Sequence, residues 1–367
     1  MKTKKMRYVW FLVILCIFCL TLFLARTRSK VEMRNRIYHQ WNEHFVVSKG
    51  KESYVRTTND SNQTVVLSEA QSYGMLITVA AAEKGQAQQA DFDRLYHYYL
   101  NHRLEGTQLM SWKQTISNGK AKDEDHNATD GDLYIAYALL KAAQQWPKQA
   151  KDYQAQAKAI LEDILAHNYN EETGVLTVGN WANQDSEFYH LMRTSDTLPA
   201  QFQIFYEVTK DSKWLDIKEK MLQQLQTISS QTKTGLLPDF IWVDEQGTRV
   251  ADPKTIESKY DGAYSYNACR LPYNLVQSKD ATSQKLVKKM LNFFKSQRNL
   301  YAGYDLKGKA LNNHQAASFL APIVYASEHE KGYLKLVQQN KYIFTQDLPL
   351  NNYYDATMTT MIALELF

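Results

Sequence analysis

Segments with the spacing of amphipathic helices follow one another along almost the whole chain after residue 45. Eleven can be delimited by apolar periodicity and by polar or glycine-containing breaks, at 68–84, 91–103, 129–146, 152–168, 199–209, 213–229, 266–277, 283–296, 314–327, 331–339 and 354–366. Short β-rich segments are few, and the best are Gly174–Val178 and Phe240–Val243. This pattern predicts an all-α array of helical hairpins. Periodicity alone does not choose between an open solenoid and a closed α/α barrel, although the lack of a visible repeat of fixed length weighs against the solenoid.

A separate apolar run lies at the N-terminus, from Val9 to Ala25. It contains 17 uncharged residues, which matches the lower limit of roughly 17 for a helix that spans a bilayer. Basic residues precede the run, and no A-x-A cleavage pattern follows it before Arg26. We therefore expect a single transmembrane helix that stays attached as a signal anchor, with a cleaved signal peptide as the alternative.

This interpretation divides the chain into a basic cytoplasmic region at 1–8, a signal anchor at 9–25, a juxtamembrane stalk at 26–40 and a folded domain at 41–367. The folded domain is expected outside the cell, held at the membrane by the anchor or secreted if the anchor is cleaved. Cys269 is the one cysteine of that domain, so no intrachain disulfide forms there and a buried apolar role is expected.

The charge of the chain is unevenly distributed. Its 43 Lys+Arg exceed its 39 Asp+Glu by four, and the first 25 residues contain four basic residues and no acid. The rest of the chain is therefore neutral, which argues against a nucleic-acid-binding domain. Aromatic residues (24 Tyr, 7 Trp and 14 Phe) make up 12% of the chain. So many rings must either pack in a core or line a binding surface.

The segment that opens the predicted helix at 68–84 has Ser68 followed three residues later by Gln71. This spacing is typical of a capping box, which puts Ser68 at the N-cap and Glu69 in the first turn. An acid in the first turn commonly does no more than complement the helix dipole. A catalytic acid needs a raised pKa, so burial or a second carboxylate would have to outweigh the dipole at Glu69.

A similar polar segment opens the predicted helix at 129–146. Thr129 is the expected N-cap with Asp132 at the third helical position, which leaves Asp130 at the mouth of the helix. The acids just upstream imitate a calcium loop, but Ala128 stands where that loop needs glycine. The nine histidines show no metal spacing, and the sequence has no phosphate-binding or nucleophile motif. We therefore expect neither a metal ion nor another cofactor.

Several further segments occur in order along the chain. They are SEAQSYGM at 68–75, Trp112-Lys113, ATDGDLYIAYALL at 128–140, TSDTLPAQFQIFYEVTKDSKW at 194–214, GLLPDF at 235–240, YSYNACRLP at 264–272, GYDLKGKAL at 303–311 and NYYDATMTTMIAL at 352–364. In this order they resemble glycoside hydrolase family 8, from about residue 37 to the C-terminus. Members of that family mostly cleave β-1,4-linked glucans, xylans or chitosans. The resemblance implies a closed (α/α)6 barrel with a cleft across the helix N-termini.

The resemblance also implies roles for individual residues. Glu69 matches the family's proton donor, and Asp130 matches an acid that contacts the sugar at the cleavage subsite. Trp112 matches an aromatic platform for a sugar ring, and Arg270 matches an arginine that supports the site. Tyr73, inside the first matching segment, is grouped with these substrate-binding residues.

One position departs from the family pattern. Many members have their general-base aspartate where this chain has Asn267, whose amide takes no proton near neutral pH and can only orient water or sugar. One branch of the family shares this asparagine and is thought to use a glutamate from the preceding loop. Here that loop carries Glu257, the favoured candidate base, and Asp261, the alternative. Asp130 in a changed role is a third option, and a fourth is that Glu257 is merely a solvated loop acid.

These observations lead to one leading function and two alternatives. We expect a monomeric, inverting endo-β-1,4-glycanase that acts on extracellular polysaccharide, with β-glucan as the leading substrate over xylan and chitosan. Aromatic rings would stack on the apolar faces of its sugars. The main alternative is a weakly active or non-catalytic glycan-binding protein that assists export or assembly of a surface polysaccharide. The other is a structural helical scaffold.

Overall fold

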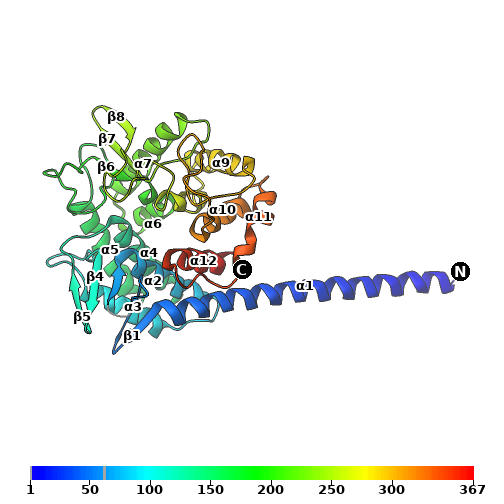
Figure 1. The fold of residues 1–367 in the computed structure, drawn as a ribbon. Helices are drawn as coiled ribbons and strands as arrows, with labels where there is room; N and C mark the ends of the chain where they lie inside the picture. The colour runs from blue at the N-terminus through cyan, green and yellow to red at the C-terminus, as the bar shows by residue number, and fades with distance from the viewer. Residues whose placement is uncertain (1, 61–62) are drawn as a thin grey trace.

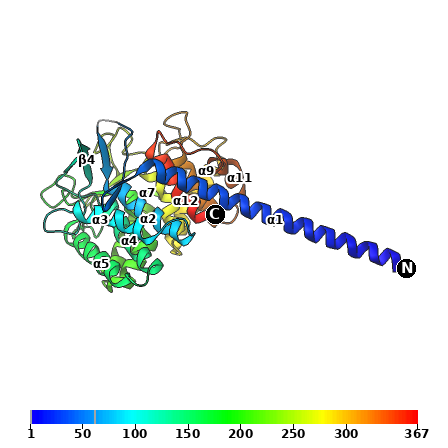
Figure 2. The same ribbon diagram turned by 90° about the horizontal axis from the view of Figure 1, so that it is seen from below.

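The computed structural model describes residues 2–60 and 63–367 (Figure 1). Its first element is one long helix, α1 (Lys2–Phe45), which projects from a helical domain in both views (Figures 1 and 2). The apolar part of α1 lies outside that domain. Within the described residues, α1 is one helix long and apolar enough to cross a membrane. The predicted N-terminal apolar helix is therefore present, but it lies within a longer helix than the predicted span at 9–25.

Eleven further α-helices occur in the described part of the chain. They are α2 (Ser68–Glu83), α3 (Gln89–Asn101), α4 (Thr129–Gln145), α5 (Ala150–His167), α6 (Pro199–Thr209), α7 (Lys213–Ser230), α8 (Leu271–Val276), α9 (Ala281–Ser296), α10 (Ala317–His329), α11 (Leu334–Asn340) and α12 (Tyr353–Leu366). Each overlaps one of the predicted helical segments, so the all-α prediction is confirmed. The largest difference is at α8, because Ala268–Arg270 forms a short 3₁₀ helix, η2, inside the segment predicted as one helix.

The helices form hairpins arranged as a closed barrel. The inner ring consists of α2, α4, α6, α8, α10 and α12, and the outer helices α3, α5, α7, α9, α11 and α1 pack on them in that order. Between α4 and α6, the 3₁₀ helix η1 (Thr194–Asp196), which leads into α6, packs against α4. The ring closes where α12 packs against α2. The predicted (α/α)6 barrel is thus confirmed in place of an open solenoid.

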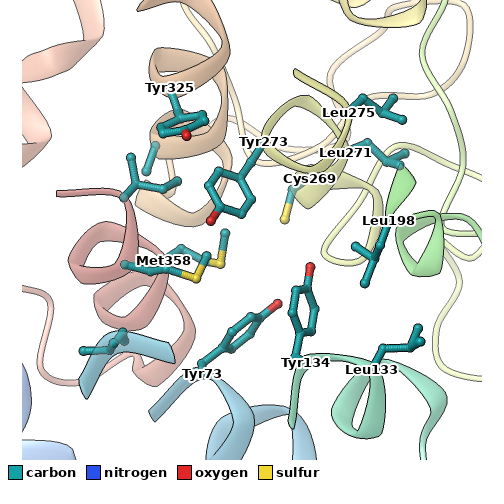
Figure 3. Close-up of a cluster of buried hydrophobic side chains, with 14 of the residues drawn as sticks. Tyr73, Leu133, Tyr134, Leu198, Cys269, Leu271, Tyr273, Leu275, Tyr325 and Met358 are labelled. Atoms are coloured by element: carbon teal, nitrogen blue, oxygen red, sulfur yellow. The ribbon is translucent and has the colours of Figure 1, made fainter. Parts of the chain in front are cut away.

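The core of the domain fills the inside of this ring. The inner helices α4 and α12 are buried on nearly every side, whereas the outer helices α5 and α7 bury one face. Figure 3 shows part of this core, where Tyr73 of α2 and Tyr134 of α4 lie side by side with ring centroids 5.2 Å apart. Cys269 is fully buried in the same region, in the apolar role that the sequence predicts.

Short strands lie in the connections between helices. They form a hairpin of β1 (Val46–Lys49) and β2 (Glu52–Val55), a sheet of β3 (Thr64–Leu67), β4 (Lys113–Ser117) and β5 (Lys120–Asp123), and a sheet of β6 (Leu191–Arg193), β7 (Phe240–Asp244) and β8 (Gly247–Val250). All pairings are antiparallel. The predicted strand Phe240–Val243 is confirmed as part of β7.

The predicted strand Gly174–Val178 is wrong. One isolated bridge forms there, between Tyr169 and Leu176. The side-chain oxygen of Asn170 accepts hydrogen bonds from the two N–H groups that begin the following turn. The turn folds this segment back on the chain just before it, so it does not join a sheet.

The last part of α1 belongs to the folded domain. Buried side chains begin at Arg34, within the segment 26–40, and continue to the end of the helix. The guanidinium of Arg34 donates to the backbone carbonyl oxygen of Phe367, the last residue, at 3.0 Å. The indole N–H of Trp41 donates to the hydroxyl of Thr357 in α12 at 2.9 Å. One continuous helix therefore joins the apolar run to the barrel.

Candidate active site

The helix N-termini at one end of the barrel surround a cavity of about 380 Å³, which we call the cleft. Its wall contains the starts of α2, α4 and α12 and the loop that leads to η2, with the lining residues Leu67, Ser68, Glu69, Trp112, Ala128, Asp130, Arg193, Glu257, Tyr266, Asn267, Tyr353 and Tyr354. The fold therefore brings together Glu69, Trp112, Asp130, Glu257 and Asn267, which were identified in separate parts of the sequence.

Glu69 and Asp130 meet because the starts of α2 and α4 approach each other closely. Each acid is the second residue of its helix. Gly131 allows the approach, since a Cβ at that position would lie 2.7 Å from the Cβ of Ser68. Such a contact is shorter than side-chain packing permits, so a side chain at 131 would push the two helices apart.

The predicted capping of these two helices is wrong. Leu67 and Ala128 occupy the N-cap positions, and neither makes a side-chain cap bond. The amide of Gln71 bonds to the backbone of β2 instead, and the hydroxyl of Thr129 donates to a loop carbonyl oxygen. The carboxylate of Asp132 accepts a hydrogen bond from the backbone N–H of Met110. Tertiary contacts thus take the polar groups that local spacing assigns to caps.

Trp112 reaches the cleft through the sheet of β3, β4 and β5. Leu67 of β3 pairs with Lys113 of β4. Just beyond this pair, the N–H of Ser68 donates to the carbonyl oxygen of Trp112 at 2.9 Å. The pairing therefore sets the Trp112 ring beside the start of α2. This ring stacks on His126 with 5.7 Å between the centroids.

Arg270 lies beneath the cleft and connects its polar groups. The residue is 1% exposed. Its Nη1 donates to Glu69 Oε2 at 2.9 Å and to Asp130 Oδ2 at 3.1 Å. Its Nη2 donates to Ser195 Oγ at 2.7 Å and to Asn267 Oδ1 at 2.9 Å. A guanidinium held by so many acceptors can orient both helix-start acids, in keeping with the supporting role that the resemblance implies.

Tyr73 also lies beneath the cleft and does not line it. Its side chain is fully buried, and its hydroxyl accepts a hydrogen bond from Arg270 Nη1 at 3.1 Å. The expectation that Tyr73 contacts substrate is therefore corrected. Its place in the structure is that of a residue which orients Arg270.

A second buried arginine, Arg193 at the end of β6, is one that the sequence analysis does not single out. Its Nη1 lies 3.2 Å from Asp130 Oδ1 and 3.6 Å from Asp196 Oδ2. Its Nη2 lies 3.3 Å from Glu257 Oε1. Arg193 directly precedes the segment at 194–214, which carries part of the family resemblance, and this position is the one sequence feature that points to it.

These contacts form an alternating row of charges, Glu69–Arg270–Asp130–Arg193–Glu257, which we call the charge row. Glu69 and Glu257 stand at its two ends and line the same cleft. Asp130 stands in the middle between two arginines. No group of three or more His, Cys, Asp or Glu within the described residues has the arrangement to hold a metal ion. The row is therefore organised by arginines as counter-charges.

Two acids of the charge row have pKa values shifted in opposite directions. Burial raises the pKa of Glu69 to about 7; Arg270 opposes this rise and Asp130 adds to it. Burial also acts to raise the pKa of Asp130, but Arg193 and Arg270 outweigh it and hold that pKa below its ordinary value. Near neutral pH, Glu69 can therefore keep a proton while Asp130 is ionised. Burial meets the condition that a catalytic acid at a helix start requires.

The loop between β8 and η2 carries the two candidate bases to different places. Glu257 lines the cleft with 44% of its side chain exposed, and Asn267 Nδ2 donates to its Oε2 at 2.8 Å. Asp261 is fully buried and does not line the cleft. Its carboxylate accepts the backbone N–H groups of residues 256–258 at 2.7–3.0 Å. Asp261 therefore shapes the loop that presents Glu257.

Aromatic rings form much of the cleft wall. Besides Trp112, they are Tyr266, Tyr353 and Tyr354, which were given no role from the sequence although all three belong to matching segments. The hydroxyl of Tyr354 donates to the carbonyl oxygen of Tyr266 at 3.1 Å, which joins the start of α12 to the loop before η2. A second cavity of about 200 Å³ shares part of this wall and adds the ring of Trp181. Such ring surfaces suit the apolar faces of sugars.

Comparison with known proteins points to the same kind of site. The family model described as Glycosyl hydrolases family 8 matches residues 13–365. A beta-glucanase from Niallia circulans is 31% identical over 298 residues, which cover 78% of this chain and 72% of that protein. An endoglucanase from a Bacillus species is 30% identical, with 71% of this chain matched to 58% of that protein. Endoglucanase A from Acetivibrio thermocellus is 27% identical, and the match covers 83% of this chain and 62% of that protein. The chain thus spans less than two thirds of both endoglucanases.

Solved structures show the same fold. The apo structure of a beta-1,3-1,4-glucanase from Paenibacillus sp. X4 superposes with a TM-score of 0.82 at 25% identity, covering 93% of this chain and 92% of that one. Rex8A from Paenibacillus barcinonensis, complexed with xylose, has a TM-score of 0.72 at 22% identity over 91% and 93% of the two chains, a likeness of fold alone. With a matching family model over nearly its whole length and the acids of its cleft in place, this chain belongs to glycosyl hydrolases family 8 and is a glycoside hydrolase.

Proposed function

We propose that this chain is an inverting endo-β-1,4-glycanase that hydrolyses β-glucan outside the cell while α1 holds it at the membrane. The observation that carries the proposal is the pair of acids at the ends of the charge row. The Glu69 side chain is 20% exposed, and its partial burial raises its pKa to about 7, whereas the Glu257 side chain in the same cleft is 44% exposed. The first can donate a proton near neutral pH, and the second can take one from water.

Inverting hydrolysis needs two carboxyl groups with room for a water molecule between them. Glu69 donates its proton to the glycosidic oxygen as the bond from that oxygen to the anomeric carbon breaks. Glu257 takes a proton from a water that attacks the anomeric carbon on the opposite face, so the new hydroxyl has the inverted configuration. Asp130, ionised between two arginines, places negative charge near the oxocarbenium-like transition state. Exchange with solvent then reprotonates Glu69 and deprotonates Glu257.

Asn267 fits this division of roles. Its amide cannot accept the proton of water, but its Nδ2 donates to Glu257 Oε2 at 2.8 Å while its Oδ1 accepts from Arg270 at 2.9 Å. It thus links Arg270 directly to Glu257, at one end of the charge row, and orients the carboxylate of Glu257. An acid held in this way by an amide and by Arg193 differs from a freely solvated loop acid, which supports Glu257 as the base.

β-Glucan is the substrate class with the most support. The relatives at 31% and 25% identity are named beta-glucanase and beta-1,3-1,4-glucanase, and others at 27–30% are named endoglucanases. The tyrosine and tryptophan rings of the cleft suit neutral pyranose units. The chain after residue 25 also has no net charge, so no overall field selects for a charged polysaccharide.

The anchor is the second part of the proposal. We expect α1 to stay attached, to cross the bilayer once and to leave the barrel outside as a monomer. None of the apolar window of α1 is buried in the barrel. The helix continues from this window into the folded domain without a break. There is therefore no loop between the apolar window and the barrel for a signal peptidase to cleave.

Reducing-end release tests the proposed activity. The full-length protein should release new ends from soluble β-glucan, and Glu69→Gln should lower that release by about 10²–10⁴-fold because the general acid is gone. Glu83→Gln is a matched control at the far end of α2, where Glu83 pairs with Lys141 at 3.0 Å, and it should keep full activity. Wild-type activity in Glu69→Gln would remove Glu69 from the mechanism.

The same assay tests the alternative of a glycan-binding protein that assists export or assembly of a polysaccharide. That alternative is favoured by Asn267 in place of the aspartate that many family members use as base. It predicts that the wild-type protein binds β-glucan yet releases no ends from β-glucan, xylan or chitosan. Release from any of the three rejects it.

A further inference from the structure

The direction in which α1 meets the barrel determines which end of the barrel faces the membrane. The ring of Phe45, the last residue of α1, packs on Tyr353 at the start of α12 with 6.0 Å between centroids. At the other end of α12, Arg34 donates to the carbonyl oxygen of Phe367, and the ammonium of Lys30 lies 5.3 Å from the Phe367 ring. The two helices are therefore antiparallel, and the apolar run leaves the barrel beyond the C-terminal end of α12.

The cleft lies at the opposite end of the barrel. Tyr353 and Tyr354 both line the cleft, and Tyr353 packs on the last residue of α1. Twenty helical residues separate Ala25 from Phe45, which is a distance of roughly 30 Å. An uninterrupted α1 therefore holds the cleft about that far from the end of the apolar run, facing away from it.

The other end of the barrel comes close to the bilayer. Five helical residues separate Ala25 from Lys30, or roughly 8 Å, and Lys30 already touches the barrel at Phe367. The headgroup layer on each side of a bilayer is about 5–8 Å thick. The surface around Phe367 must therefore lie at the level of the headgroups if α1 spans the membrane.

The 3₁₀ helix η3 (Lys341–Phe344) and α11 form part of this end. Arg36 donates to the carbonyl oxygens of Phe344 and Gln346, and the Phe344 ring packs on Phe367 at 5.4 Å. Figures 1 and 2 both show α11 on the side of the barrel from which the N-terminal half of α1 projects. η3 and α11 thus extend the surface that α1 brings to the membrane.

The exposed face of α11 has the composition of a membrane contact. Leu334 is 64% exposed, and among the described residues outside α1 the other exposed large hydrophobic side chain is Tyr266 in the cleft. Lys331 and Lys335 flank Leu334 and are exposed as well. From 331 to 346 the chain contains three lysines and no acid. A single apolar side chain among lysines fits an anionic headgroup layer better than it fits water.

We infer that α11 rests in the headgroup layer of an anionic bilayer, with Leu334 inserted and Lys331 and Lys335 on lipid phosphates, while the cleft opens away from the membrane. This inference rests on the anchor in the proposed function. It assigns the substrate to glycan strands standing about 30 Å outside the bilayer, because a lipid-linked sugar at the membrane surface would lie at the wrong end of the barrel.

The test uses the full-length chain in vesicles, with Cys16→Ala and Cys19→Ala so that an added cysteine is the labelled one and the buried Cys269 is left in place. A polarity-sensitive dye is attached at Leu334→Cys or, as control, at Lys51→Cys in the exposed β1–β2 turn just beyond the far end of α1. The vesicles are phosphatidylcholine with or without phosphatidylglycerol. With phosphatidylglycerol, the dye at 334 should shift to the blue and be quenched by headgroup spin labels, while the dye at 51 should do neither.

Charge variants test whether position 334 contacts anionic lipid or merely lies near the bilayer. Lys331→Gln with Lys335→Gln should abolish the blue shift at 334 on anionic vesicles, whereas Lys120→Gln with Lys122→Gln on the exposed strand β5 should leave it unchanged. A dye at 334 that stays in water, equal signals at 334 and 51, or a shift that ignores phosphatidylglycerol would each overturn the inference.

Two readouts keep this inference apart from the proposed function. A protein that fails to float with the vesicles contradicts the anchor and with it this inference, whereas a floating protein with a water-exposed dye at 334 contradicts this inference alone. Hydrolysis of soluble β-glucan is measured in the same samples and should be equal for all variants, because neither lysine pair lines the cleft.

Discussion

Burial and two arginines shift the pKa values of two neighbouring carboxyl groups of this cleft in opposite directions. Asp130 lies between Arg193 and Arg270, and both hold its pKa down against burial. Glu69 has one arginine partner at 2.9 Å, and burial raises its pKa to about 7. A proton donor and a fixed negative charge can therefore stand side by side on adjacent helix starts.

The pKa of Glu69 predicts an alkaline limit of activity. Because the protonated form is the one that donates, kcat/KM should fall as pH rises through about 7. Asp130→Asn removes a negative neighbour that raises this pKa, so it should move the alkaline limb to lower pH as well as reduce the rate. A pH series on soluble β-glucan measures both, and a limb that stays in place or moves to higher pH would contradict the assignment.

Glu257 and Asp261 should differ in how far the rate depends on them. Glu257→Gln should lower kcat by about 10²–10⁴-fold, because the group proposed to take a proton from water is gone. Asp261→Asn weakens the backbone contacts that shape the loop, so it should lower kcat less. Turnover of soluble β-glucan by the two variants measures the difference, and a larger loss in Asp261→Asn than in Glu257→Gln would exchange the two roles.

Sequence segments predicted the residues that line the cleft better than the residues that hold them in place. Glu69, Asp130 and Trp112 lie inside matching segments, and the fold brings them to one cleft. Arg193 lies outside such a segment, and its importance depends on three acids that are far apart in the chain. The expected cap at Ser68 failed for a related reason, because Gln71 is used by β2 rather than by its own helix.

At the scale of elements, the cleft exists because several inner helices begin at the same end of the barrel. The starts of α2, α4 and α12 line it, and the positive ends of their helix dipoles favour negative charge there. Helical periodicity made these helices predictable. Most strands were not predictable, because they have three to five residues each and their partners are distant, as for β3 and β4.

Gly131→Ala tests the close approach of α2 and α4. Alanine would favour a helix in isolation, but here its Cβ would collide with Ser68, so we expect a loss of about 1–3 kcal/mol in the free energy of unfolding and a lower kcat. Ser68→Gly in the same chain removes part of the collision and should restore activity in part. Thermal unfolding and β-glucan turnover measure the two effects. A Gly131→Ala variant that is stabilised and fully active would show that the approach is not tight.

At the scale of the whole molecule, α1 contains both the apolar run that we propose as an anchor and the last outer helix of the barrel. Its pairing with α12 joins the two ends of the chain next to the closing contact of α12 with α2. Periodicity could predict hairpins but not this closure, because ring closure depends on contacts between the first and last helices. The family resemblance supplied the closed barrel, and the structure confirms it.

The raised pKa of Glu69 also predicts how stability depends on pH. Its folded pKa of about 7 exceeds its ordinary value of 4.5, so the folded chain binds a proton that the unfolded chain releases between these values. This contribution is present at low pH and is lost as pH rises through 7. Relative to Glu69→Gln, the wild type should therefore lose up to about 3 kcal/mol of stability between pH 5 and pH 8.

Thermal midpoints of the two full-length proteins in detergent at both pH values measure this difference. Asp132 and Asp196, whose pKa values burial raises to about 8 and about 7, titrate in both proteins and should largely cancel in the comparison. A gap between the midpoints that does not change with pH would show that Glu69 does not keep its proton in the folded state.

The most direct test of the central claim is the anomer that forms first. Glu69 as acid and Glu257 as base on opposite faces of the sugar require inversion at the anomeric carbon. Proton NMR of a β-1,4-linked glucan oligosaccharide, recorded immediately after mixing with the wild-type protein, should show the α-anomer at the new reducing end before mutarotation. A β-anomer as the first product would contradict the account.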